Sequence, residues 1–143
     1  MIRIQLLLTI MLISFTCFAK AQQEDVNACL RQATIMENSN RYQDALGYCT
    51  KALILNPLYD ESYFRRGYYK YLLGDITGAI RDFDVAIKLN PDNVDAHLYK
   101  ASCLQKTGSN VGALNEYNRA RKLDAFLTIT HMARGLLGTM VGE

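Results

Sequence analysis

Apolar residues recur at intervals of three and four through most of the chain, which is the period of an amphipathic helix rather than of a strand. In the middle of the chain, Ile80, Phe83 and Ile87 follow this spacing and define the apolar side of one helix. The pattern predicts a first helix over residues 61–73 and a second helix over residues 76–89. We therefore expect an all-α protein built from short, paired helices.

Local stop and start signals separate the predicted helices. Gly74 tolerates the left-handed backbone that often ends a helix, and the side-chain oxygen of Asp75 can cap the next one. Pro91 has no backbone N–H and cannot continue the second helix, after which Asn93 offers another cap. The equivalent turns of the neighbouring segments fall at residues 40–41 and 108–109.

The helix pair repeats along the chain with a period of 34 residues. Pro57 and Pro91 are 34 residues apart, and they close the similar phrases ALILNP and AIKLNP. Alanine recurs at this spacing at positions 45, 79 and 113, and the third copy has Ala125 in the place of the proline. Such units bury their apolar faces by stacking on neighbours. We predict three of them, over residues 26–59, 60–93 and 94–125.

Small residues mark where the two helices of a unit approach most closely. In the middle unit these are Gly67 and Ala79, and Ala101 and Ala113 take the same places in the third. A larger side chain there would cost roughly 1–3 kcal/mol through overpacking.

These features resemble the tetratricopeptide repeat family. The resemblance rests on the period, on the two-helix unit and on Tyr63, Gly67, Ala79, Phe83, Ala86 and Pro91 of the middle unit. The sequence departs from the family pattern at Arg66 and Lys70, where leucine and tyrosine are common, and the flanking units match less closely. Over residues 26–125, the resemblance implies a right-handed superhelix of three helix–turn–helix repeats. It also implies a non-catalytic scaffold that binds other proteins, without identifying the partner.

The resemblance places one face of each first helix on a concave groove. Tyrosine and arginine are favoured at binding hot spots, since large, stiff side chains lose little entropy on contact. We predict a groove for an extended peptide or a partner helix, formed by Leu30, Thr34, Phe64, Arg65, Tyr68, Tyr71, Leu98, Tyr99 and Ser102. The same aromatic residues are also compatible with a purely structural role, filling space between repeats.

One binding mode of the family does not fit the residue types. Members that grip the C-terminal carboxylate of chaperones use lysine, asparagine and arginine at set groove positions. The matching positions here hold Leu30, Thr34, Arg65, Asp95 and Tyr99. Only Arg65 is basic, and Asp95 would repel a carboxylate, so we do not expect this mode.

Residues 126–143 predict a last helix that covers the open end of the stack. A solenoid end leaves an apolar face uncovered, which is why such arrays carry a capping element. This segment is unusually apolar, so Met132, Leu136 and Met140 are candidates for self-association. The alternative function is therefore a structural homodimer that serves as a subunit of an envelope protein complex.

The first 21 residues have the order of a secretory signal peptide. Arg3 supplies a positive start, an apolar run covers residues 4–18, and an A-x-A site follows at residues 19–21. The run is shorter than the roughly 20 residues that a spanning helix needs. We expect an exported mature chain, residues 22–143, periplasmic or secreted and without a membrane span. An uncleaved anchor and a lipoprotein acylated at Cys17 are the alternatives.

The charge balance gives no reason to expect nucleic acid or an anionic membrane as a partner. The formal net charge is +2, and both surplus positive charges, Arg3 and Lys20, lie near the start. From residue 22 onward 14 basic and 14 acidic residues cancel, because the 16 basic residues include those two. A neutral body does not attract a polyanion.

The sequence contains no pattern that predicts catalysis, a metal site or a cofactor site. His97 and His131 lie in different predicted helices, and neither belongs to a metal or nucleophile motif. The mature chain would keep Cys29, Cys49 and Cys103, an odd number that leaves at least one free thiol or an intermolecular bond in an oxidising compartment. A Cys29–Cys49 bridge is compatible with the helix pairing, but buried free thiols that act as small apolar groups fit better.

Overall fold

The computed structural model describes residues 11, 13–14 and 25–141, and it describes residues 127–141 by their backbone alone. A helix over residues 25–38 is followed by α2 (Tyr42–Leu55), α3 (Asp60–Leu72), α4 (Ile76–Leu89), α5 (Val94–Lys106) and α6 (Asn110–Val141). The described part of the chain contains helices and turns and no strand. Apart from three positions, the predicted signal peptide lies outside the described residues.

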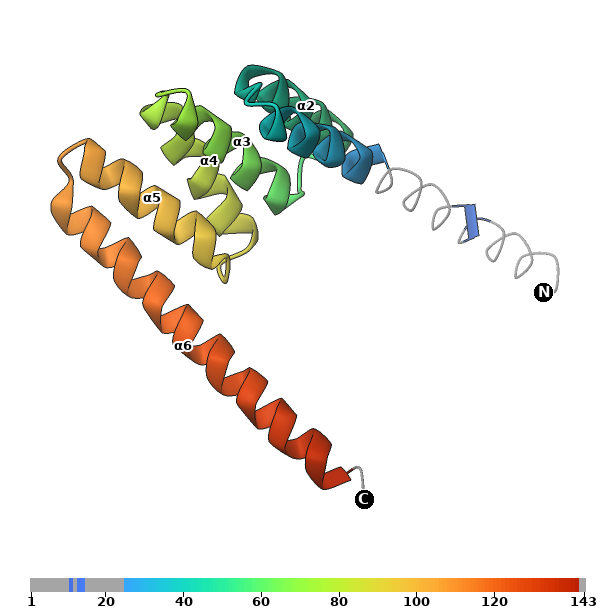
Figure 1. The fold of residues 1–143 in the computed structure, drawn as a ribbon, viewed down its shortest axis with the longest axis vertical. Helices are drawn as coiled ribbons and strands as arrows, with labels where there is room; N and C mark the ends of the chain where they lie inside the picture. Colours follow the sequence, from blue (N-terminus) through green and yellow to red (C-terminus); the bar gives the residue numbers. More distant parts are fainter. Residues whose placement is uncertain (1–10, 12, 15–24, 142–143) are drawn as a thin grey trace.

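Helices that follow one another in the sequence pack side by side and form a curved stack (Figure 1). The predicted pairs are present: the helix over 25–38 with α2, α3 with α4, and α5 with the first part of α6. The second helix of the middle unit has the bounds that the pattern predicts, and the first begins and ends one residue earlier than predicted. The all-α repeat architecture is therefore confirmed.

The turns between paired helices use the predicted residues. Gly74 has a φ of 87° and Gly108 a φ of 83°, and both therefore occupy the left-handed region where a side chain would be strained. The Asp75 carboxylate accepts a hydrogen bond from the Gly78 N–H at 2.9 Å and caps α4. The Asn93 side chain caps α5 in the same way through the Ala96 N–H, also at 2.9 Å.

The core confirms that Gly67 marks a close approach of α3 and α4. A Cβ atom at Gly67 would lie 2.9 Å from Cε1 of Phe83 and 3.2 Å from Cβ of Asp82. Phe83 and Ala79 are fully buried. Gly67 therefore makes room mainly for the Phe83 ring, a contact one turn further along α4 than the alanine that the sequence pattern pairs with it.

A buried acid–base contact joins the two helices in each of the last two repeats. In the middle repeat, Arg66 donates from Nε and Nη2 to the Asp82 carboxylate at 2.8 and 2.6 Å, and Nζ of Lys70 lies 2.8 Å from the same group. This contact explains why Arg66 and Lys70 depart from the family pattern. They neutralise a carboxylate that is almost completely buried.

The equivalent contact of the third repeat is centred on Glu116. Its two carboxylate oxygens lie 2.6 Å from Nδ1 of His97 and 3.0 Å from Nζ of Lys100. His97 also contacts the backbone oxygen of Pro91 through Nε2, at 3.0 Å. His97 is thus a structural group that holds α5 against α6 and the preceding turn.

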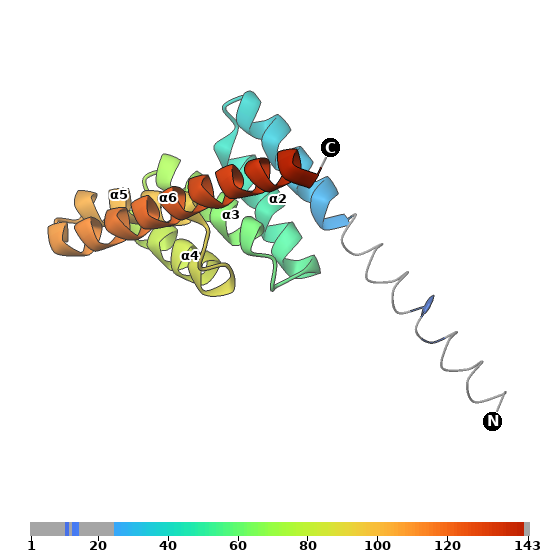
Figure 2. The same ribbon diagram turned by 90° about the horizontal axis from the view of Figure 1, so that it is seen from below.

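The predicted boundary between the third repeat and a separate last helix is wrong. α6 is one continuous helix of 32 residues that runs through Ala125 (Figure 2). The reason is local: Ala125 is a strong helix former at the position where Pro57 and Pro91 end the earlier repeats. The covering role of residues 126–143 stays a prediction. No helix in the described part of the chain is both long and apolar enough to cross a membrane.

The three cysteines of the described chain are free thiols, so the Cys29–Cys49 bridge is not formed. Cys49 and Cys103 are fully buried, and Cys29 is partly exposed. Burial raises the pKa of Cys49 to about 12 and that of Cys103 to about 11. Both therefore behave as small apolar groups in the core.

Candidate partner-binding groove

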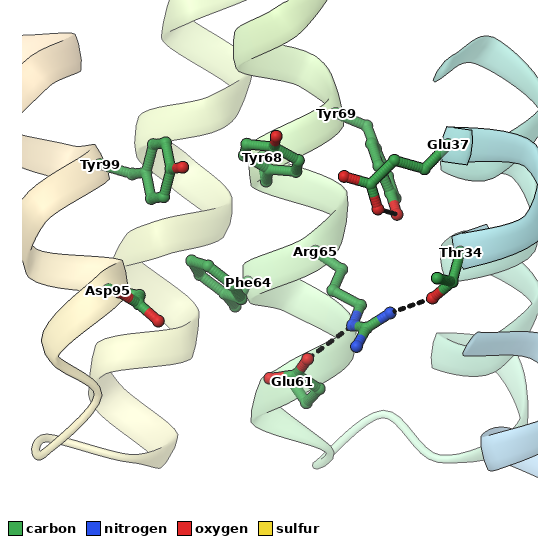
Figure 3. Close-up of a pocket in the computed structure, with 9 residues that line it drawn as sticks. All are labelled: Thr34, Glu37, Glu61, Phe64, Arg65, Tyr68, Tyr69, Asp95 and Tyr99. Carbon is green, nitrogen blue, oxygen red and sulfur yellow. Dashed lines mark hydrogen bonds and ion pairs between the residues drawn. The ribbon is translucent and has the colours of Figure 1, made fainter. Parts of the chain in front are cut away.

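A hollow lies on the groove side of the stack, between the helix over residues 25–38, α3 and α5 (Figure 3). Its volume is about 290 Å³. The first helices of three successive repeats supply its walls, as the repeat pattern predicts. The lining residues are Thr34, Glu37, Glu61, Phe64, Arg65, Tyr68, Tyr69, Asp95 and Tyr99.

Aromatic rings from α3 and α5 form one wall. The ring centroids of Tyr68 and Tyr99 are 5.1 Å apart in an edge-to-face arrangement, and those of Phe64 and Tyr99 are 6.0 Å apart. Tyr99 also stacks at 6.1 Å on the buried Phe83 of α4. The rings therefore fill space between repeats and line the hollow at the same time, and their positions are fixed by the core behind them.

Arg65 forms the opposite side and bridges two repeats. Its Nε donates to Glu61 at 2.6 Å, one turn earlier on α3, and its Nη1 donates to the Thr34 hydroxyl at 2.7 Å. Partial burial lowers the pKa of Arg65, but the hydrogen bond and charge of Glu61 outweigh it, and the pKa lies above its ordinary value. The guanidinium is therefore a permanent cation held in one orientation.

The Tyr69 hydroxyl donates to the Glu37 carboxylate at 2.9 Å and closes the upper side of the hollow. Burial, and then the hydrogen bond to Glu37, raise the pKa of Tyr69 well above that of a free tyrosine. The hydroxyl stays protonated and donating, and it ties α3 to the preceding repeat.

Carboxylates outnumber cations in this hollow. Glu37, Glu61 and Asp95 face a single cation, Arg65. Asp95 is exposed at the lower edge, on the first turn of α5. A ligand that enters here meets aromatic faces, one guanidinium and an acidic rim.

The structure brings together most of the sequence-predicted groove. Thr34, Phe64, Arg65, Tyr68 and Tyr99 line this hollow, and Leu30 lines an adjoining one together with Thr34 and Arg65. The hydroxyl groups of Tyr71 and Ser102 lie further up, 3.1 Å apart, with the Tyr71 ring 5.8 Å from that of Tyr99. Leu98 is the exception. It lies in a separate hollow between α5 and α6. The side chains of Met132, Leu136 and Met140 are outside the described part of the structure.

Sequence reasoning missed Glu61 and Tyr69 as lining residues. Glu61, Arg65 and Tyr69 are spaced by four, so they share one side of α3. That spacing was a usable signal. The burial of the Tyr69 ring was not, because it depends on Glu37, which is 32 residues away in the sequence.

Solved structures with the same fold include repeat domains from several sources. The TPR2B domain of yeast Sti1, in a complex with pHsp70, superposes with a TM-score of 0.72 at 21% identity and covers 78% of this chain and 90% of that one. The Yersinia enterocolitica type III secretion translocator chaperone SycD gives a TM-score of 0.69 at 17% identity, over 81% and 91% of the two chains. At these identities the likeness establishes the fold.

Relatives in sequence are parts of larger proteins. The human SGT1 homolog is 35% identical over 82 residues, which are 57% of this chain and 22% of that protein. Rat serine/threonine-protein phosphatase 5 is 34% identical over 62 residues, which are 43% of this chain and 12% of that protein. The chain thus spans about a fifth of the first relative and about an eighth of the second.

A family model supplies the assignment. The tetratricopeptide repeat model matches residues 30–92 and 64–127, more than half of the chain. The match contains the repeats that line the hollow and the period found in the sequence. The chain belongs to the tetratricopeptide repeat family.

Proposed function

We propose that this protein is a non-catalytic scaffold that binds a segment of another protein in its concave groove. The hollow bounded by Phe64, Arg65, Tyr68 and Tyr99 is the observation that carries the proposal. Solenoids of this kind use their concave surfaces for binding. Two structural neighbours support it by their own ligands: the Sti1 domain is bound to pHsp70, and the first TPR of RPAP3 is bound to the HSP90 peptide SRMEEVD.

The groove is built to bind without rearrangement. Packing on Phe83 fixes the Tyr99 ring, and Glu61 and Thr34 fix the Arg65 guanidinium, so little conformational entropy remains to be lost on binding. Within the described contacts, Nη2 of Arg65 makes no hydrogen bond and can donate to a backbone oxygen of the partner. The aromatic faces would take an apolar or aromatic side chain of the same segment.

The groove chemistry argues against an acidic C-terminal tail as the ligand. Asp95 stands where family members that hold such tails have a basic residue, and Glu37 and Glu61 add negative charge beside it. A carboxylate brought between these groups would be repelled at close range and would gain only Arg65 as a partner. We therefore place the partner segment among internal stretches of chain or amphipathic helices.

The test is a crosslinked pull-down from the envelope fraction, followed by titration of the captured partner. Tyr68→Ala should weaken binding by about 2 kcal/mol, roughly 30-fold in Kd, if Tyr68 is a hot spot. Tyr48→Ala is the matched control, since Tyr48 is a partly buried tyrosine that lines a different hollow on α2. Thermal melting of both variants separates a lost contact from a lost fold. Equal affinity of the two variants would mean that the groove tyrosines only pack between repeats.

A further inference from the structure

The outer side of α6 has the shape of a repeat interface without its second half. Tyr117 is the period-related equivalent of Phe83 and Cys49, both fully buried, but it is 37% exposed. Leu114 is the equivalent of Ile80, which packs in the core, and it is 60% exposed. In the inner repeats, the first helix of the next repeat covers these positions, as Tyr99 covers Phe83. The exposed face therefore fits a helix.

A hollow marks the place where that helix would lie. It lies between α5 and α6, has a volume of about 430 Å³, and is lined in part by Leu98, Tyr117 and Ala120. Val111 continues the apolar strip along α6 and is 77% exposed. This explains why Leu98 is absent from the concave groove: in the last repeat its position faces the uncovered end.

The chain does not cover this face itself. α6 continues without a break beyond Ala125, and its C-terminal half runs on past the end of α5 instead of folding back (Figures 1 and 2). A straight helix cannot lie against its own outer side, so the helix that completes the interface must come from another molecule.

We propose that the C-terminal half of α6, residues 126–141, covers the open end of a second copy of this chain. α6 has 32 residues, so residues 110–125 and 126–141 are halves of equal length, about 24 Å each at 1.5 Å per residue. Two copies of α6 laid antiparallel therefore set each C-terminal half on the other copy's first half. The arrangement is two-fold symmetric, which is the commonest symmetry of homodimers.

The sequence of the two halves suits this pairing. Residues Phe126, Ile129, Met132, Leu136 and Met140 follow the spacing of an apolar helix side. With the two-fold axis between Ala125 and Phe126, the backbone position of Val111 lies opposite that of Met140, and Leu114 lies opposite Leu137. Phe126, which is 63% exposed, lies at the axis, where it meets the same residue of the second copy.

The experiment is light scattering over a concentration series on the protein produced from its full-length sequence and purified as it accumulates. The natural protein should be a dimer. Leu114→Glu, on the open end, and Leu136→Glu, on the C-terminal half, should each raise the dimer dissociation constant by roughly 30-fold or more, the effect of a lost hot spot. Ile54→Glu is the control, because Ile54 is an apolar residue of α2 that is 78% exposed and lies outside the proposed interface.

Mixing the two variants gives the decisive result. A pair made of Leu114→Glu and Leu136→Glu keeps one intact contact, in which the natural C-terminal half of one copy meets the natural open end of the other. The mixture should therefore form heterodimers more tightly than either variant forms homodimers. Circular dichroism melting of each variant alone verifies the fold.

Four outcomes would overturn the proposal. A natural protein that stays monomeric leaves nothing to cover the open end. A dimer sensitive to Leu136→Glu but not to Leu114→Glu would mean that the C-terminal halves pair with each other. Sensitivity to Leu114→Glu alone would give the open end another occupant. Equal disruption by Ile54→Glu would point to association through general surface hydrophobicity.

Discussion

At the scale of single residues, charge is placed inside the repeats in a periodic way. Arg66 and Lys100 are 34 residues apart, and so are Asp82 and Glu116. Each acid is buried against a base from the partner helix. Burying an ion pair is tolerated when its hydrogen bonds are complete, but removing one member leaves an uncompensated charge. These pairs therefore fix how the helices of each repeat are joined.

Glu116→Gln should destabilise the protein at neutral pH and much less in acid. Burial alone raises the pKa of Glu116, but hydrogen bonds from His97 and Lys100 and the nearby positive charges outweigh it and hold the pKa below its ordinary value. Since the folded-state pKa is depressed, the stabilisation is fully present above the ordinary value of about 4.3 and is lost as the pH falls through the folded value. Urea unfolding at pH 7 should show a loss of about 3 kcal/mol, the cost of a broken buried pair.

The pH profile carries the test of this prediction. The free energy of unfolding of the natural protein should fall more steeply than that of Glu116→Gln between pH 5 and pH 3. Asp92→Asn, in the exposed turn after α4, is the control and should follow the natural protein throughout. Parallel profiles for the natural protein and Glu116→Gln would contradict the assigned role.

The site residues found from sequence share one property. Thr34, Phe64 and Tyr99 belong to first helices, and the repeat pattern alone decides which side of those helices faces the groove. Tyr69 was missed because its place depends on a hydrogen bond to Glu37 of another repeat. Leu98 was misplaced because the pattern assumes a following repeat, which this chain lacks. Local spacing thus predicts a face, and long-range contacts decide what occupies it.

At the scale of elements, helix ends were predictable wherever a local signal exists. α4 begins after the Asp75 cap and ends before Pro91, and both signals can be read in the sequence. The end of the third repeat was mispredicted because periodicity suggested a boundary at Ala125 that no breaking residue enforces. Alanine favours the helix more than any other residue, so the helix continues.

Ala125→Pro should change the association state if the C-terminal half of α6 covers a second copy. The ring removes an N–H and clashes with the carbonyl four residues earlier, so α6 should end near residue 124. Residues 126–141 would then be able to turn back onto the open end of their own repeats. We expect a monomer by light scattering, with similar helix content by circular dichroism.

Ala125→Gly is the control for that variant. It lowers helix propensity by about 1 kcal/mol but keeps the N–H, so the helix and the dimer should both persist. A dimeric Ala125→Pro protein would show that the continuity of α6 does not determine where its C-terminal half binds.

At the scale of the whole molecule, the two proposed surfaces adjoin. Asp95 lines both the concave hollow and the hollow at the open end. A helix that covers the open end would therefore lie close to one edge of the groove. Pairing of two copies is thus expected to place two grooves in one assembly, each with its acidic edge near the contact.

The proposal that the protein works outside the cytoplasm predicts a defined N-terminus. The A-x-A site at residues 19–21 should direct cleavage, so that the accumulated protein starts at Gln22. N-terminal sequencing and intact mass of the protein purified from its producing cell provide the measurement. A chain that starts at Met1 would indicate an uncleaved anchor, and a lipid on Cys17 would indicate a lipoprotein.

The one-sided packing of α6 also has a consequence for how the array unfolds. α3 and α4 each pack between two helices, whereas α6 packs against α5. Opening α6 in a single copy breaks one helix interface, and opening α3 breaks two, so the free energy of local opening rises toward the middle. Amide hydrogens of α6 should exchange through fraying of the end, and those of α3 and α4 only when the whole stack unfolds. The middle repeat is then the part of the molecule that unfolds last and on which the outer repeats depend.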